Sequence, residues 1–437
     1  MRGEAAYLDL ASAALAACEC DQAEVIVSGT DSSLTRFAES CIHQNVSERN
    51  ATVSVRAILG KRIGCARGNE LTREGAQAVA GRALDLARVS AENARFVSLP
   101  APEPLPSVTA FFEATAGSTP EARAATARAI AERAARSGCV ASGSLSAESS
   151  EVAVANSLGV HAYAPATQAS LVLVVSDGES SGYAEWRGAD ISRLDVEAVA
   201  ERATRKCAEG RGAQEAEPGQ YTVVLEPPAV ADMLSLLAYV GLGALAYQEG
   251  RSFLSGRLGE RVVGENITIW DDATDPRQLA FPFDWEGVPK RKVVMIEKGV
   301  ARTPVYDSYT AAIEGRASTG HALPAPNTYG PMPLHLFMGE GEASLEDMIA
   351  STERGILVTR FHYTNVVHER QTTITGMTRD GTFLIERGQV TRPLRNLRFT
   401  QSIVEALGRV ELVGREAVLC EYAHVPPLKV TRFAFTS

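Results

Sequence analysis

The sequence has few lysines, few histidines and no long apolar run. Six of its 43 basic residues are lysine, and histidine occurs seven times. No apolar stretch approaches the ~20 residues that a membrane-spanning helix needs, which argues against a membrane span. The first residues, MRGEAAYLDLASAALAAC, carry acidic side chains within their apolar stretch. That pattern indicates an amphipathic helix rather than a signal peptide.

The seven cysteines are an odd number and are scattered along the chain. They form no C-x-x-C pair and no disulfide framework, so we expect reduced thiols and a cytoplasmic location. Cys18 and Cys20 form the one close pair. We expect them to lie on different faces of the first helix, as partly buried thiols.

The composition is that of a globular protein. The chain has 437 residues, of which 45% are apolar and 22% charged. This length predicts two or three structural units, and this composition excludes a wholly disordered chain. The net charge is 43 − 53 = −10. An acidic chain without a basic cluster argues against nucleic acid or an anionic membrane as the main partner.

Linker segments rich in proline and glycine divide the chain into three units, at 1–106, 107–217 and 218–437. In the first unit a helix to about Cys20 is followed by strands over 23–69 and by a helix capped by Thr72. The second unit repeats this plan, with a helix that begins at Thr119-Pro120-Glu121, then strands, then a helix that ends at Gly210.

The third unit begins with a strand near 221–227 and one long helix over 229–250. Short apolar runs then alternate with glycine and proline about every ten residues. This pattern predicts a β-rich sandwich or barrel-like domain. We therefore predict an α+β fold, with an N-terminal α/β region of two similar strand–helix units and a β-rich C-terminal domain.

Two glycine-rich motifs have alternative explanations. Residues 178–182 match G-x-S-x-G, but a nucleophile elbow needs a helix directly after the serine, and YAEWRGAD follows. We interpret this motif as a hairpin turn. Gly241-x-Gly243-x-x-Ala246 matches a dinucleotide fingerprint, but it lies within a predicted helix instead of between a strand and a helix.

The histidines form no metal-binding spacing. His368-Glu369 begins an H-E-x-x-H pattern, but Thr372 stands where the second histidine is needed. His362 and His368 are roughly 20 Å apart along a strand, too far for one metal. Asp284 and Glu286 could serve acid–base chemistry, but the following Gly-Val-Pro favours a turn with capping carboxylates.

An ordered series of segments in the third unit resembles a known family. The series is SFLSGRLGE, ITIWDD, FPFDWEGVP, IEKGV, STGH, GEASLEDMI, ERGILVTRFHYTNVV, TGMTRDGTFLIERGQVTRP and NLRFTQSI. In the first unit RFAES and VRAILGKRIGCARGNEL agree. Together they closely resemble the TldD/PmbA family, the "modulator of gyrase" metallopeptidases, over nearly the whole chain.

The resemblance implies two kinds of subunit. The TldD kind is similar to a zinc peptidase, with H-E-x-x-x-H on the first helix of the C-terminal domain and a later cysteine ligand. Here the corresponding helix, 233–250, contains no histidine, and TNVVHERQTTITG stands in place of the Cys-Gly motif. Without imidazoles or a thiolate, that helix cannot build a zinc cage. The chain thus resembles the TldE (PmbA) kind.

The resemblance further implies a heterodimer with a TldD-type subunit, whose zinc polarises the scissile amide and whose glutamate is the base. No catalytic residue, metal or cofactor is then expected in this chain, which shapes a cleft for unfolded peptides or a peptide-like natural-product intermediate. The candidate cleft residues are polar and lie at strand ends or turns. They are Ser318, Thr319, Gly320, His321, His362, Asn365 and His368.

Two other hypotheses remain open from the sequence. One is a homo-oligomeric hydrolase whose site is assembled from scattered His, Asp and Glu residues. The other is a scaffold that binds peptides without cleaving them. Stoichiometric zinc with hydrolysis by the lone chain favours the first, and peptide binding without turnover favours the second.

Overall fold

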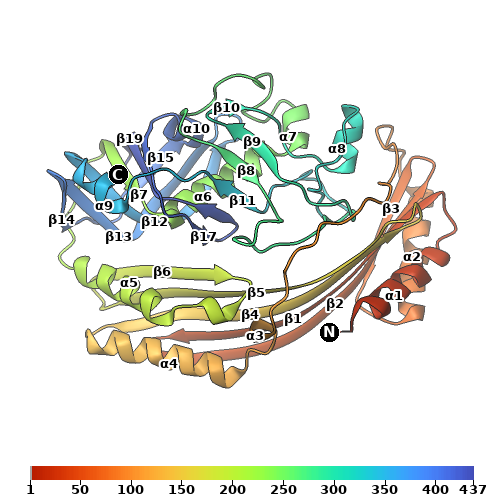
Figure 1. Cartoon of the computed structure of the whole chain (residues 1–437), viewed down its shortest axis with the longest axis horizontal. Coiled ribbons are helices and arrows are strands. Elements are labelled where there is room, and N and C mark those ends of the chain that lie inside the picture. The colour runs from red at the N-terminus through yellow and green to blue at the C-terminus, as the bar shows by residue number, and fades with distance from the viewer. Residues whose placement is uncertain (1) are drawn as a thin grey trace.

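The computed structural model describes residues 2–437 and has a mixed architecture, with 24% helix and 39% strand. The predicted α+β fold class is confirmed. Two strand–helix units build one large curved sheet, and the β-rich C-terminal domain lies over one face of it (Figure 1). Within residues 2–437 no helix has both the length and the hydropathy to cross a membrane.

The two N-terminal units share a plan of a helix, three antiparallel strands and a helix, to which the second unit adds the short helices α3 and η1. The first comprises α1 (Glu4–Ala16), β1 (Gln22–Ala38), β2 (Cys41–Leu59), β3 (Arg62–Gly68) and α2 (Arg73–Val89). The second comprises α3 (Glu113–Ala116), α4 (Pro120–Arg136), β4 (Val140–Asn156), β5 (His161–Ser176), β6 (Ser181–Gly188), η1 (Ile191–Arg193) and α5 (Val196–Glu209).

The strands of both units form a single six-stranded sheet with the order β3-β2-β1-β4-β5-β6. β1 and β4 join the units antiparallel, with Val25 opposite Ala155. On one face α1 and α2 cover one end of the sheet, and α4 and α5 cover the other (Figure 1). The other face packs Ile26, Val152 and Val154 against Phe283 of the C-terminal domain. Successive side chains of β1 therefore point to opposite faces of the sheet and pack into two different cores.

Local sequence signals place the helix starts. Thr72 accepts a hydrogen bond from Gly75 N at 3.0 Å, and Thr119 accepts one from Ala122 N at 3.2 Å, as the N-cap pattern predicts. The predicted hairpin turn at 178–182 is confirmed by the antiparallel pair β5–β6. The prediction for the first helix was wrong at its end, because α1 stops at Ala16. Cys18 and Cys20 consequently lie in the following turn, with their Sγ atoms 3.4 Å apart.

The C-terminal domain contains two sheets. Its helices are α6 (Pro227–Leu237), η2 (Ala238–Leu242), α7 (Ala244–Gln248), α8 (Ser308–Ile313), α9 (Leu345–Ala350) and α10 (Ile403–Leu407). Its strands are β7 (Gly219–Leu225), β8 (Ile269–Asp271), β9 (Val293–Glu297), β10 (Val300–Ala301), β11 (Leu336–Met338), β12 (Arg354–His368), β13 (Thr373–Glu386), β14 (Gln389–Pro393), β15 (Arg398–Ser402), β16 (Val410–Val413), β17 (Val418–Cys420), β18 (Ala423–Val425) and β19 (Leu428–Phe435).

One C-terminal sheet closes on itself. The strands β12, β7, β19, β15 and β13 pair in this order, and β13 pairs again with β12. The second sheet has the order β10-β9-β8-β11-β18-β17. The domain is thus barrel-like, and α6 packs against β12 over an apolar core.

The single helix predicted over 229–250 is wrong. α6 continues as one π-helical turn, η2, and the chain then becomes extended at Gly243 before α7 begins. A side chain at Gly243 would overlap the carbonyl oxygen of Pro331. Ala244 N donates to Val305 O at 2.9 Å instead of to its own helix. The backbone of a distant loop approaches Gly243 closely and interrupts the helix. The apolar periodicity of the sequence does not reveal this contact.

The packing of α2 on β3 gives a stability prediction. A Cβ at Gly64 of β3 would overlap the backbone of Ala83 and Ala87 in α2. We expect Gly64→Ala to lower the free energy of unfolding by roughly 1–3 kcal/mol, because the helix must move away from the strand. Denaturant titration measures the change. Gly81 of α2 has open space around its Cβ position. Gly81→Ala is the matched control and should stabilise by about 1 kcal/mol, so equal losses in both variants would contradict this account.

Candidate functional site

The Ser318–His321 turn is fixed inside the C-terminal domain. Thr319 Oγ1 accepts a hydrogen bond from Tyr306 N at 2.7 Å, and Ser318 Oγ donates to Tyr306 O at 3.2 Å. Gly320 has φ 76°, and a side chain there would overlap the carbonyl of Pro289. The turn therefore needs glycine and packs directly against the backbone that leads to Lys290.

His321 belongs to a buried polar network. Its Nε2 lies 3.0 Å from Asp271 Oδ1, and its Nδ1 lies 3.0 Å from Thr319 Oγ1. The second oxygen of Asp271 accepts the backbone N–H of His335 at 2.7 Å. Burial opposes ionisation of Asp271, but the charge and hydrogen bond of His321 hold its pKa well below its usual range. His321 is completely buried, so its role here is to orient the network.

A second buried cluster joins the N-terminal sheet to the C-terminal domain. One guanidinium nitrogen of Arg56 lies 2.6 Å from Glu24 on the neighbouring strand and 3.1 Å from Glu286 of the C-terminal domain. Burial raises the pKa of Glu24 to about 7, although the charge of Arg56 opposes the shift. Asp284 accepts backbone N–H groups from Glu286, Val288 and Ala322 at 2.8–3.0 Å. The predicted turn with a capping carboxylate is therefore what residues 283–289 form.

Between these clusters and the sheet lies a cavity of about 330 Å³. Hydroxyl-bearing residues of β1 and β4 line its sheet side, and aromatic residues of the 281–285 loop line the opposite side. Lys290 also lines it and is largely buried, and no carboxylate of residues 2–437 lies within ion-pair distance of its Nζ. The aromatic wall, the Lys290 ammonium group and the carboxyl groups of Glu148 and Asp284 that also line the cavity suit a ligand with apolar groups, carbonyl oxygens and N–H donors, such as an extended peptide.

The remaining predicted residues lie elsewhere. His362 of β12 lines a separate cavity of about 200 Å³ with Asp232 and Arg360. Asn365 is exposed and donates to Tyr363 O, and His368 is exposed and accepts the N–H of Gln371. None of the seven predicted residues lines the cavity under the sheet; the Ser318–His321 turn packs behind its wall, where Ala322 and Lys290 line the cavity, and His362, Asn365 and His368 lie elsewhere.

Sequence reasoning missed Asp271, Lys290 and His335. Asp271 lies 50 residues from His321 in the sequence and 64 from His335. No spacing rule relates residues so far apart, so only the fold identifies them as neighbours.

Three family models cover most of the chain. The PmbA/TldA metallopeptidase C-terminal domain matches residues 218–437, the central domain matches 115–209, and domain 1 matches 23–87. The chain belongs to the PmbA/TldD metallopeptidase family. TldE from Thermococcus kodakarensis has the same fold, with a TM-score of 0.91 at 22% identity over 99% of this chain and 100% of that one.

Curated relatives match about half of the chain's length. An uncharacterized protein of Methanocaldococcus jannaschii is 34% identical over 214 residues, which are 48% of this chain and 50% of that protein. A metalloprotease TldD homolog of Haemophilus influenzae is 27% identical over 234 residues, 52% of this chain and 47% of the homolog. The chain thus spans about half the length of the curated relatives that it matches.

Removing the positive charge of Arg56 should strongly lower the free energy of unfolding. Arg56→Met leaves Glu24 and Glu286 buried without a counter-charge, and we expect a loss of about 3–5 kcal/mol in the free energy of unfolding. Arg49→Met removes an exposed partner of Asp31 and should cost less than about 1 kcal/mol. Denaturant titration of both variants checks this. If both variants lost similarly little free energy of unfolding, the interdomain cluster would contribute little to stability.

The buried ring of His335 should make the protein acid-sensitive. Burial, together with the positive charge of Lys290, lowers the pKa of His335 to about 3. Between pH 6.5 and about 3 the unfolded state binds a proton that the native state does not, so stability falls as the pH falls, by up to about 1.4 kcal/mol per pH unit. His335→Gln should reduce this slope by that amount in denaturant titrations at several pH values. An unchanged slope would contradict the assignment.

Proposed function

We propose that this chain is the non-catalytic, TldE-type subunit of a heterodimeric zinc metallopeptidase or amide hydrolase. In this assembly a TldD-type partner supplies the zinc and the general base. This chain shapes the cleft that admits unfolded peptides or a peptide-like natural-product intermediate. The observation that carries the proposal is the composition of 227–250, the segment where the family resemblance puts the zinc motif. It contains no histidine and no cysteine.

The local structure of that segment supports the proposal. The turn η2 in this segment holds Tyr239 and Val240, and the extended residue Gly243 interrupts the helix. Neither a phenol nor an alkyl group is a usual zinc ligand. The residues present therefore do not fit the zinc of the TldD kind, and no hydrolytic step is assigned to this chain.

Exposed aromatic side chains support a partner surface on the C-terminal domain. Tyr239 and Tyr329 are 50% and 61% exposed, and their ring centroids lie 6.0 Å apart. Tyr363 of β12 is 80% exposed. Aromatic side chains are enriched in protein interfaces, and clustered exposed ones indicate an interaction site. Tyr239 lies within the segment without histidine and Tyr329 lies beside it, so a partner bound there would contact that segment.

The partner surface can be tested by binding. We expect Tyr239→Glu to weaken association with a TldD-type subunit at least ~30-fold, because a buried interface tyrosine contributes about 2 kcal/mol or more. Analytical ultracentrifugation or titration calorimetry with the purified subunits measures the affinity. Val89 at the end of α2 is 81% exposed and lies in the N-terminal unit, so Val89→Glu is the matched control.

The control should leave the affinity unchanged. If Tyr239→Glu also binds like the wild type, this surface is not the interface. If the wild-type chain associates only with itself and hydrolyses peptides, it is a homo-oligomeric hydrolase, and the subunit proposal is wrong.

A further inference from the structure

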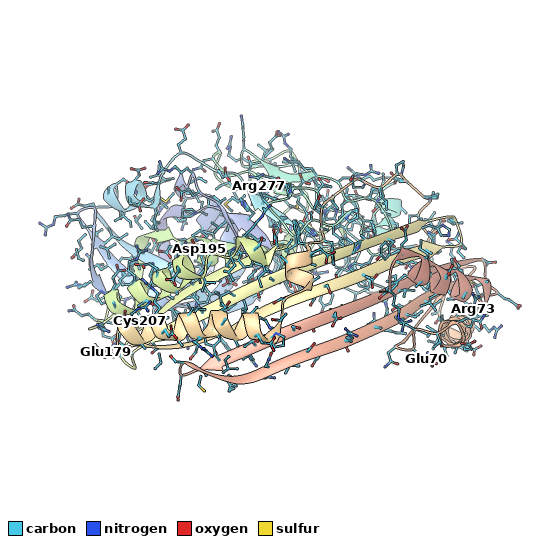
Figure 2. All side chains as sticks on the ribbon, turned by 60° about the horizontal axis from the view of Figure 1, so that its bottom comes forward. Glu70, Arg73, Glu179, Asp195, Cys207 and Arg277 are labelled. Carbon is cyan, nitrogen blue, oxygen red and sulfur yellow. The ribbon has the colours of Figure 1, made fainter. Side chains whose placement is uncertain are left out.

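Two buried cysteines and an aspartate meet at the end of the sheet far from α1 and α2. Cys139 directly precedes β4, Asp177 begins the turn between β5 and β6, and Cys207 lies in the last turn of α5. Both thiols are almost completely buried. Figure 2 shows Cys207 and Glu179, from the same turn as Asp177, together at this end, opposite Glu70 and Arg73. The proposed role as a non-catalytic subunit does not involve this cluster.

The spacing of the two sulfurs in the cluster is that of a tetrahedral metal site. The Sγ atoms of Cys139 and Cys207 lie 3.8 Å apart, and one oxygen of Asp177 lies within 4.8 Å of both. Two Zn–S bonds of about 2.3 Å at a tetrahedral angle separate the sulfurs by about 3.8 Å. Ser180 Oγ lies 3.5 Å from Cys207 Sγ, close to the ~3.6 Å expected between a sulfur and an oxygen ligand of the same zinc.

One oxygen of the Asp177 carboxylate is available to a metal. Its Oδ1 accepts the N–H groups of Glu179 and Ser180 and the hydroxyl of Ser180, which fixes the side chain. Its Oδ2 is held by Arg211 Nε at 2.5 Å. The Arg211 side chain is 47% exposed, so it can move aside at the small cost typical of an exposed ion pair.

The charges balance when a divalent ion binds. Two thiolates and one carboxylate carry −3, the ion carries +2, and the guanidinium of Arg211, whose Nη2 lies 4.0 Å from Cys139 Sγ, carries +1. Each thiol loses its proton to solvent as its metal–sulfur bond forms, so binding releases two protons. Thiolate ligands select zinc over magnesium or calcium, which prefer oxygen.

We propose that Cys139, Asp177 and Cys207, with Ser180 as the fourth ligand, form a structural zinc site. The ion joins the start of β4, the β5–β6 turn and the end of α5, three elements that are separated in the sequence. All four positions are filled by protein ligands, so the site has no open position for substrate water and is distinct from a catalytic zinc. Zinc in the lone chain is then compatible with a chain that does not hydrolyse peptides.

The site can be tested with Co²⁺ alone as the probe. The full-length chain, reduced and freed of metal by a chelator, is titrated with Co²⁺ under anaerobic conditions. We expect one Co²⁺ per chain, with the visible bands of tetrahedral cobalt and a thiolate-to-cobalt band in the near ultraviolet, all abolished by added Zn²⁺. Cys207→Ser and Cys139→Ser should each weaken binding about 100-fold or more, because loss of even an outer partner of a ligand costs 10- to 100-fold.

Two variants serve as controls. Cys420→Ser removes a buried cysteine outside the cluster, and Cys20→Ser removes a member of the other close pair. Both should keep the cobalt bands. Asp177→Asn keeps the turn but removes the anionic ligand, and it should weaken binding even if the serine variants fold poorly.

Three outcomes would overturn the proposal. The wild-type chain could show no thiolate-to-cobalt band, or the bands could persist in Cys139→Ser. Alternatively, the two thiols could resist alkylation until reduced and bind no cobalt, which would make the pair a disulfide. None of these outcomes affects association with the TldD-type subunit, so the structural site and the proposed function are tested separately.

Discussion

Arg56 is a largely buried cation that carboxylates from both halves of the molecule share. Glu24 lies beside it in the N-terminal sheet, and Glu286 reaches it from the C-terminal domain. Buried charges are tolerated only when they are paired and hydrogen-bonded, so this contact constrains how the domain sits on the sheet. The cavity that Lys290 lines lies at the same interface. Its shape therefore depends on the position that the Arg56 cluster fixes.

The same interface bears on the proposal that this chain binds peptides without hydrolysing them. The family's metallopeptidase-like architecture is intact, from the long sheet to the closed barrel. The segment 227–250, however, contains no histidine and no cysteine, although the family resemblance implies the zinc motif of the TldD kind there. What remains is a surface with exposed tyrosines and an internal cavity with a free ammonium group. These are binding features, and they favour a chain that completes another subunit's site.

The sequence predicted features that depend on neighbouring residues. The caps at Thr72 and Thr119, the hairpin at 178–182 and the turn at Asp284 rest on local turn and capping chemistry, and the structure has them all. Features that depend on distant residues could not be predicted. The joining of both N-terminal units through β1 and β4 needs pairings across more than a hundred residues. The break at Gly243 depends on the loop at Pro331, and His321 finds Asp271 only in the folded chain.

The central claim is that hydrolysis requires a partner. The most direct measurement is the hydrolysis of a mixed pool of unstructured peptides by the zinc-loaded lone chain, by the TldD-type subunit and by the two together, followed by mass spectrometry. The account predicts that the lone chain leaves the pool intact and that the pair cleaves it. Cleavage by the lone chain would contradict the account and would place a hydrolytic site among its own residues.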